Sequence, residues 1–182
     1  LGMGRTAKAI GAGSAHTCAL LDNNTVKCWG DSGHGQLGQG DVTDRGDNPN
    51  EMGDNLNAVD LGAGRTVKSM GTGAVHTCGL LDNNALKCWG YNLYGQLGQG
   101  DADDRGNNSN EMGDNLPAIN LGADRTVKIV FAAASNTCAL LDNGTIKCWG
   151  YNLYGQVGQG DVKHRGDNPS EMGDLLPAIV LR

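Results

Sequence analysis

Short apolar runs separated by stretches rich in glycine, asparagine and aspartate recur along the whole chain. The first run is AKAIGAG at residues 7–13. It is followed by HTCALL at 16–21 and TVKCWG at 25–30, which flank a polar turn. A fourth run, AINLG, occupies residues 118–122. β-Branched and apolar residues interrupted by Gly, Asn and Asp are typical of strands, and no segment keeps the helical period of about 3.6 residues. The pattern predicts an all-β chain.

The same pattern returns every 60 residues, and residues 1–60 match residues 61–120 at 39 of 60 positions. Four short strands in each repeat are typical of a propeller blade. We therefore predict three four-stranded antiparallel blades at 1–60, 61–120 and 121–182, with boundaries that can be permuted relative to these phases. The residues that mark the period are Cys18, Cys78 and Cys138; Cys28, Cys88 and Cys148; Trp29, Trp89 and Trp149; and Leu1, Leu61, Leu121 and Leu181.

Composition narrows the class of protein. The chain has 182 residues, of which 30 are glycine and one is phenylalanine, and its formal net charge is −6. Many glycines favour tight turns over long helices. An acidic chain is not expected to bind nucleic acid, because phosphate recognition needs a basic surface. No apolar run is long enough to span a membrane. Residue 1 is Leu and no signal peptide is present, so we expect a mature or excised segment of a longer protein.

The spacing of the cysteines predicts a disulfide-closed hairpin in each repeat. A three-residue loop at 22–24 would end on a residue in the left-handed region, which Asn24, Asn84 and Gly144 tolerate. This register places Cys18 directly opposite Cys28, within reach of a disulfide. Such a bond would stabilise each repeat by roughly 3 kcal/mol. The predicted disulfide residues are Cys18, Cys28, Cys78, Cys88, Cys138 and Cys148.

Two alternatives for the cysteines are free thiols and a zinc site. His16, Cys18 and Cys28 supply three of the four ligands that zinc needs. The third repeat keeps both cysteines but has Asn136 in place of the histidine. We therefore favour the disulfide, and we expect neither a metal nor a cofactor.

The motifs GxGxxHTCxL, KCWG and GQLGQGD, together with EMGDNLPAI at 111–119, resemble the RCC1 (regulator of chromosome condensation) repeat, in particular its cysteine-containing, secreted versions. The resemblance covers the whole chain. It implies antiparallel four-stranded blades arranged around an axis in a closed ring. Two segments depart from the pattern: repeat 1 has DSGHG where the others have YNLYG, and repeat 3 has FAAASNTC where the pattern expects GxGxxHTC.

Other motifs have both a functional and a structural interpretation. Three sequons mark Asn23, Asn107 and Asn143 as candidate glycosylation sites, against chance occurrence in an Asn-rich chain. Four tyrosines in the corner after the hairpin are candidates for contact with a partner: Tyr91, Tyr94, Tyr151 and Tyr154. The Arg-Gly-Asp sequence at 45–47 and the acidic cluster around Asp41 suggest integrin or calcium binding, but we favour loop ordering by Arg–carboxylate pairs. We expect the tryptophans to pack between blades.

No set of residues predicts catalysis, so we expect a non-enzymatic protein. Six cysteines in three predicted disulfides indicate an oxidising compartment, outside the cell or at its surface. Three blades leave sheet edges exposed, which favours a longer repeat chain, several copies completing one ring, or a head-to-tail filament. The leading hypothesis is an extracellular structural or interaction scaffold that associates with copies of itself or with another protein. The alternatives are a discrete propeller that binds or inhibits a partner through its loop face and, less favoured, a guanine-nucleotide exchange factor.

Overall fold

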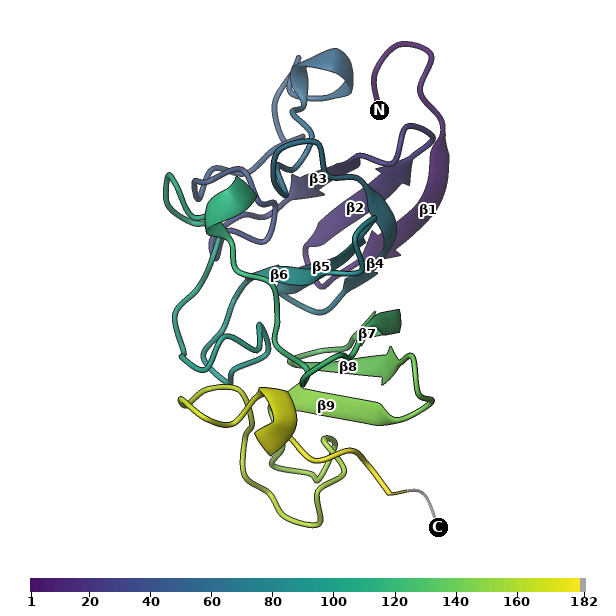
Figure 1. The fold of residues 1–182 in the computed structure, drawn as a ribbon. Helices are drawn as coiled ribbons and strands as arrows, with labels where there is room; N and C mark the ends of the chain where they lie inside the picture. The colour runs from purple at the N-terminus through teal and green to yellow at the C-terminus, as the bar shows by residue number, and fades with distance from the viewer. Residues whose placement is uncertain (181–182) are drawn as a thin grey trace.

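The computed structural model describes residues 1–180, so Leu181, which shares the 60-residue phase, lies outside the described residues. Each 60-residue unit contains three strands and one short 3-10 turn (Figure 1). The elements are β1 (Ala7–Ala12), β2 (His16–Leu21), β3 (Val26–Gly30) and η1 (Gly53–Asn55); β4 (Val67–Thr72), β5 (His76–Leu81), β6 (Leu86–Gly90) and η2 (Gly113–Asn115); β7 (Val127–Ala132), β8 (Asn136–Leu141), β9 (Ile146–Gly150) and η3 (Gly173–Leu175).

Each sheet is an antiparallel meander of three strands, in the orders β1-β2-β3, β4-β5-β6 and β7-β8-β9. The prediction of four strands per blade is therefore wrong. The fourth apolar run approaches the sheet, where the amide of Ile119 donates to the carbonyl of Leu86 at 2.8 Å, but it forms no strand. Val59 and Ile179 make the same single bond in units 1 and 3, and one bond does not extend into a ladder. The run instead supplies buried side chains such as Ile119 and Leu121.

The hairpin register matches the prediction. Cys18 pairs with Cys28 across β2 and β3, and the equivalent cysteines pair in the other two sheets. Asn24, Asn84 and Gly144 have φ values of 64°, 67° and 82°. The three-residue loop therefore ends in the left-handed region, where Asn and Gly are the least strained residues.

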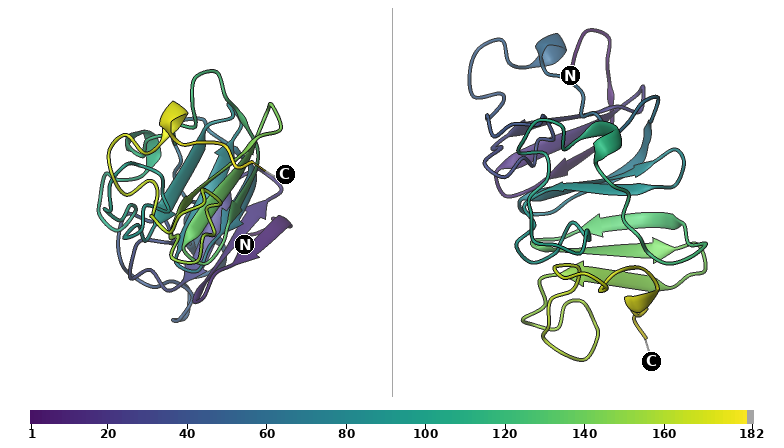
Figure 2. Two further views of the ribbon diagram at one scale, coloured as in Figure 1. Left: turned by 90° about the horizontal axis from the view of Figure 1, so that it is seen from below. Right: turned by 60° about the vertical axis from the view of Figure 1, so that its left-hand side comes forward.

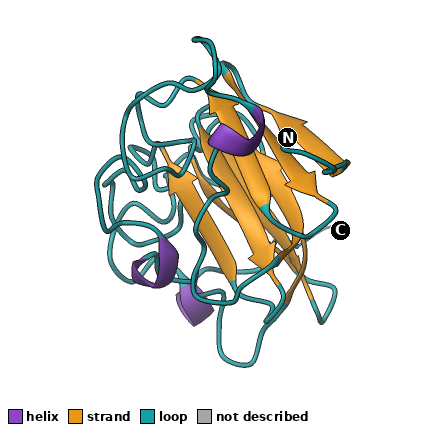
Figure 3. Cartoon of the chain, turned by 90° about the horizontal axis from the view of Figure 1, so that it is seen from above, coloured by secondary structure: helices purple, strands orange, loops and turns teal. Residues whose placement is uncertain are grey.

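The three sheets lie face to face in a stack, with the loops gathered to one side (Figures 2 and 3). Each sheet has a cysteine face, which carries the disulfide, and a tryptophan face on its opposite side. The cysteine face of one unit packs on the tryptophan face of the next, so that Cys18, Leu20 and Val26 cluster with Leu81 and Trp89. Units 2 and 3 repeat this arrangement. Residues 1–180 form an open stack of three units and no closed ring.

Glycines let the loops of neighbouring units touch through their backbones. A Cβ atom on Gly35 would overlap the backbone nitrogen of Asn107 in the next unit, and one on Gly95 would overlap that of Asp167. The amide of Gly40 donates to the carbonyl of Gly106 at 3.1 Å across the same junction. This close approach is a physical reason for part of the high glycine content.

Candidate functional site

All three predicted disulfides are present, with Cα–Cα separations of 4.0–4.1 Å. The first two lie in the junctions between units, because the next unit covers the cysteine face, and their four sulfur-bearing residues are fully buried. The third, between Cys138 and Cys148, lies on the uncovered face of unit 3, and Cys138 is only half-buried. The three hairpins therefore have the same disulfide, which is buried at a junction in units 1 and 2 and lies on an uncovered face in unit 3.

In units 1 and 2, the histidine two residues before the first hairpin cysteine joins the unit to the next one. His16 Nε2 lies 3.0 Å from Thr77 Oγ1, and His76 Nε2 lies 2.9 Å from Thr137 Oγ1. These threonine hydroxyls in turn donate to the carbonyls of Gln36 and Gln96. Each histidine Nε2–H therefore donates, and the zinc alternative does not describe these rings.

Burial lowers the pKa of both histidines. The pKa of His76 falls to about 3, because the fully enclosed ring loses its solvation and, to a smaller extent, because His16 repels its charge. Burial also lowers the pKa of His16, against the opposing attraction of Asp31. Both Nδ1 atoms are buried without a hydrogen-bond partner. The rings therefore serve the junction in their neutral form.

The carbonyl of the first glutamine in each GQLGQGD loop is a second link across the junction. Gln36 O accepts from the indole of Trp89 at 3.1 Å, and Gln96 O accepts from Trp149 at 3.0 Å. Sequence reasoning missed these contacts, although the glutamine recurs in every unit at the same phase. Trp89 and Trp149 are fully buried at the two junctions, which confirms the predicted packing between units for these two residues. Trp29 is half-buried on the outer face of unit 1 and does not follow the prediction.

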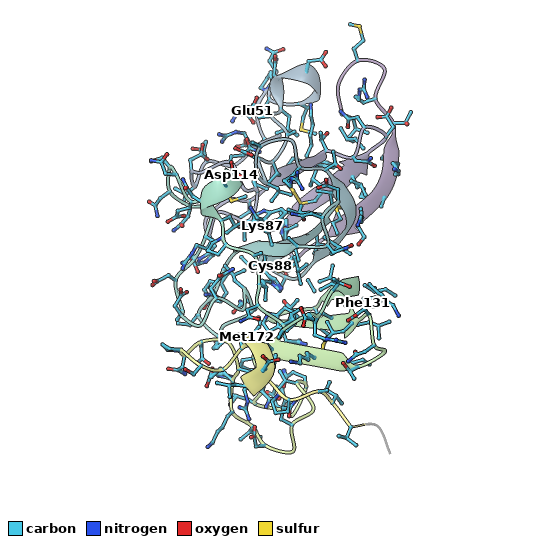
Figure 4. The ribbon with its side chains drawn as sticks, in the orientation of Figure 1. Glu51, Lys87, Cys88, Asp114, Phe131 and Met172 are labelled. Carbon is cyan, nitrogen blue, oxygen red and sulfur yellow. A yellow bond between two sulfur atoms is a disulfide. The ribbon has the colours of Figure 1, made fainter. Side chains whose placement is uncertain are left out.

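Lys87 holds the long loop of unit 2 against its sheet and was also missed from sequence (Figure 4). Its Nζ donates to the carbonyl of Leu61 at 2.9 Å and to that of Gly113 at 2.8 Å. Burial lowers the pKa of Lys87, against the attraction of Asp114 and Asp60. Lys147 makes the equivalent pair of bonds in unit 3.

The carboxylates of the long loops take part in loop hydrogen bonds. Arg45 pairs with Asp41 at 2.8 Å, and the equivalent arginines pair in units 2 and 3. Glu51 accepts from the amides of Gly46 and Asn48, which lower the pKa of its carboxyl. Within residues 1–180, no group of three or more His, Cys, Asp or Glu residues is placed to hold a metal ion. The arginine of the Arg-Gly-Asp sequence is thus an ordering element of its own loop.

The four predicted partner-facing tyrosines lie together with two histidines in a row of ring contacts that crosses all three units, which we call the aromatic ladder. Its rings meet mostly edge to face, at centroid distances of 4.6 Å to 6.2 Å. The members are His34, Tyr91, Tyr94, Tyr151, Tyr154 and His164. Repeat 1 departs from the tyrosine pattern, yet His34 fills the place beside Tyr91 and pairs with Asp104 at 2.8 Å.

The ladder ends in a groove of about 400 Å³ on unit 3. Tyr94, Tyr151 and Tyr154 line it together with Asn136 and Gln156. Tyr154 is 87% exposed, whereas Tyr94 is half-buried among rings of units 2 and 3. The ladder therefore offers an aromatic surface that is most exposed at Tyr154.

The structure places the three candidate glycosylation sites differently. Asn23 and Asn143 are exposed on hairpin tips, and each side-chain carbonyl accepts from the hydroxyl of the sequon threonine, at 2.8 Å and 2.7 Å. Asn107 is half-buried between units, and its Oδ1 has no hydrogen-bond partner. Two of the three sequons are thus accessible. No helix within residues 1–180 has the length and apolar character to cross a membrane.

Comparison with curated proteins gives relatives that are much longer than this chain. The ultraviolet-B receptor UVR8 of Arabidopsis thaliana is 34% identical over 155 residues, which are 85% of this chain and 32% of UVR8. The probable E3 ubiquitin-protein ligase HERC4 of Homo sapiens is 30% identical over 173 residues, which are 94% of this chain and 15% of HERC4. The chain therefore spans about a third of the length of UVR8 and about a seventh of the length of HERC4.

Solved structures share the fold. Human WBSCR16 superposes with a TM-score of 0.65 at 19% identity, over 90% of this chain and 38% of its own. Prp20p of Saccharomyces cerevisiae superposes with a TM-score of 0.65 at 21% identity, over 88% of this chain and 37% of its own. The sequence model of the regulator of chromosome condensation (RCC1) repeat matches residues 7–36, 67–96 and 127–156. With one match in every 60-residue unit, the chain is built from three RCC1 repeats.

Proposed function

We propose that this chain is a non-enzymatic interaction scaffold that works in an oxidising compartment, outside the cell or at its surface. The observation that carries the proposal is the disulfide that recurs at one position in all three units. Such bonds persist in oxidising compartments and are rare in the cytosol and nucleus, where thiols are kept reduced. Three independent retentions of one cross-strand pair favour a structural bond over a redox-active one.

The use of the polar side chains supports a scaffold. Residue types that often carry out catalysis make structural contacts here: His16 and His76 bond to threonines, Lys87 bonds to two carbonyls, and Arg45 pairs within its loop. Their bonds hold unit to unit and loop to sheet. These polar side chains therefore fix the positions of the units and loops, and a preorganised surface is favourable for binding a partner.

The aromatic ladder is the surface that best fits a protein partner. Tyrosine is enriched at interfaces because it presents a large apolar ring and a polar tip at low entropic cost. Prp20p, which shares the fold, binds Gsp1p and histones, and it has been solved as yeast RCC1 bound to Kap60. A partner-binding role through the ladder is therefore our second candidate. Nucleotide exchange is less favoured, because it belongs to reducing compartments where these disulfides would not persist.

Non-reducing peptide mapping of the protein from its native source tests the proposal. We expect three cross-linked peptide pairs, Cys18 with Cys28, Cys78 with Cys88 and Cys138 with Cys148, and no alkylation before reduction. The sequons report on the same compartment, since Asn23 and Asn143 would carry glycans while Asn107 would not if the route is a eukaryotic secretory pathway. Six alkylated thiols in the unreduced protein would overturn the assignment of compartment.

A further inference from the structure

The cysteine face of unit 3 differs from the cysteine faces that are covered inside the stack. It is open, and it forms an apolar groove of about 400 Å³. The residues that line the groove are Ile129, Phe131, Cys138, Ala139, Leu140 and Ile146. Units 1 and 2 use the same face to receive the next unit, so their residues show what a close junction requires.

The first strands of neighbouring units, β1, β4 and β7, approach one another so closely that one position leaves little room for any side chain. Gly11 on β1 faces the next unit, where an added Cβ would lie 2.5 Å from Thr72 Oγ1. The equivalent Gly71 on β4 would place a Cβ 3.0 Å from the backbone nitrogen of Ala132. Unit 3 has Phe131 at this position, and the side chain is 66% exposed (Figure 4). A phenylalanine ring stands where the next unit's strand would pack.

The turn between the first two strands has a second such position. A Cβ on Gly13 would lie 2.5 Å from the carbonyl oxygen of Gly73, and one on Gly73 would overlap the carbonyl of Ala133. Backbone hydrogen bonds fix this spacing, because Ser14 N donates to Ala74 O at 2.8 Å and Ala74 N donates to Ala134 O at 2.9 Å. Unit 3 carries Ala133 at the position of these glycines. Its methyl group fills the space that the carbonyl of a further turn would take.

The third change removes a bond. His16 and His76 reach across their junctions to a threonine of the next unit. Unit 3 has Asn136, whose shorter side chain is half-buried beside the open face. Asn136 in place of histidine is also compatible with Ala133, because in unit 2 a Cβ at Gly73 would overlap the ring of His76. The alanine and the asparagine are therefore a matched pair.

We propose that Phe131, Ala133 and Asn136 end the close stacking at unit 3. The tryptophan face of unit 1 is open, so unit 1 of a second copy is a candidate to pack on the cysteine face of unit 3. In the geometry of the two internal junctions it does not fit there. A further unit of this type covers the face only when its first strand is set back from β7 by the ring of Phe131. The three residues thus exclude a further junction of the internal geometry on this face, independently of the compartment in which the protein works.

Moving the three residues into an internal junction tests this assignment. In the variant G71F/G73A/H76N, we expect unit 3 to separate from unit 2. Hydrogen exchange at the Ala74 amide should rise at least about tenfold, since its protecting bond to Ala134 opens. The indole of Trp149 should become accessible to quenchers, whereas that of Trp89, in the untouched junction, should stay protected. Continued protection of Trp149 would overturn the proposal. The pair G73A/H76N leaves out the phenylalanine ring and should give the same change to a smaller extent.

The reverse variant, F131G/A133G/N136H, restores on unit 3 the residues of a closed junction. Sedimentation velocity of the wild-type protein should show one mass at all concentrations, and the variant should gain concentration-dependent head-to-tail assembly. The control V162A removes an exposed apolar side chain away from the face and should sediment like the wild type. Concentration-dependent assembly of the wild-type protein, or none in the reverse variant, would overturn the proposal.

Discussion

At the scale of single residues, His76 shows how the stack depends on a neutral ring. Its Nε2–H donates to Thr137, while the unprotonated Nδ1 is enclosed without a hydrogen-bond partner. Protonation would add a donor at Nδ1 that has no partner, in a place where a charge is poorly solvated. This is why the pKa of His76 falls to about 3 in the folded protein.

The lowered pKa predicts a pH dependence of stability. Because the unfolded histidine binds a proton near pH 6.5 and the folded one only near pH 3, the contribution of His76 is complete above pH 6.5 and is lost as the pH falls toward 3. Within that window one proton corresponds to about 1.4 kcal/mol per pH unit. The variant H76N, which uses the residue natural to unit 3, should lose that part of the slope. Urea unfolding at pH 7.5, 6.0 and 5.0 measures it, and equal slopes in the two proteins would contradict the prediction.

At the scale of elements, each hairpin is the same local structure in a different setting. The disulfides of the first two hairpins are covered by the following unit, and their cysteines are fully buried. The third hairpin has no following unit within the described residues, so Cys138 is half-buried on the open face. Access of an attacking thiolate to the sulfur limits the rate of disulfide exchange.

The three disulfides should therefore be reduced in a set order under native conditions. We expect a mild thiol reductant to open the Cys138–Cys148 bond first, and the Cys78–Cys88 bond only when unit 3 moves away from unit 2. Timed alkylation followed by peptide mass analysis gives the three rates. In strong denaturant the three bonds should be reduced equally fast, which serves as the control. Equal rates in the native protein would show that the junctions give no protection.

At the scale of the whole molecule, the open stack that residues 1–180 form has two unlike ends. Unit 3 ends in a cysteine face with Phe131, whereas unit 1 ends in a tryptophan face that carries Ile10 and a half-buried Trp29. Between the ends, Trp89 and Trp149 are fully buried and bonded to glutamine carbonyls. The three equivalent tryptophans therefore differ in exposure according to the position of their unit in the stack.

Tryptophan fluorescence should report this asymmetry. Iodide, which does not enter protein cores, should quench Trp29 and leave Trp89 and Trp149 emitting. The variant W29F should remove nearly all of the quenchable emission, because the two remaining indoles lie inside the junctions. W89F should keep the quenchable component of the wild-type protein. Strong quenching that persists in W29F would mean that the internal junctions open in solution.

Features that depend on neighbouring residues could be predicted from the amino-acid sequence. Asn24 in the left-handed position sets the loop length, the loop sets the register, and the register places Cys18 opposite Cys28, all within a few residues of the turn. The 60-residue period likewise follows from the chain alone. The fourth run was misread as a strand, since its apolar pattern suits either a strand or a loop that packs on a sheet edge.

How the units meet could not be predicted in this way and is seen in the packed structure alone. The bond from His16 to Thr77, the approach of Gly71 to Ala132 and the path of Lys87 to Gly113 join residues that lie far apart along the chain. A local pattern specifies the shape of each hairpin, but it carries no information about which side of the sheet the next unit covers. For the same reason FAAASNTC appeared only as a departure from the motif. Its consequence for the end of the stack follows from the distance between packed strands.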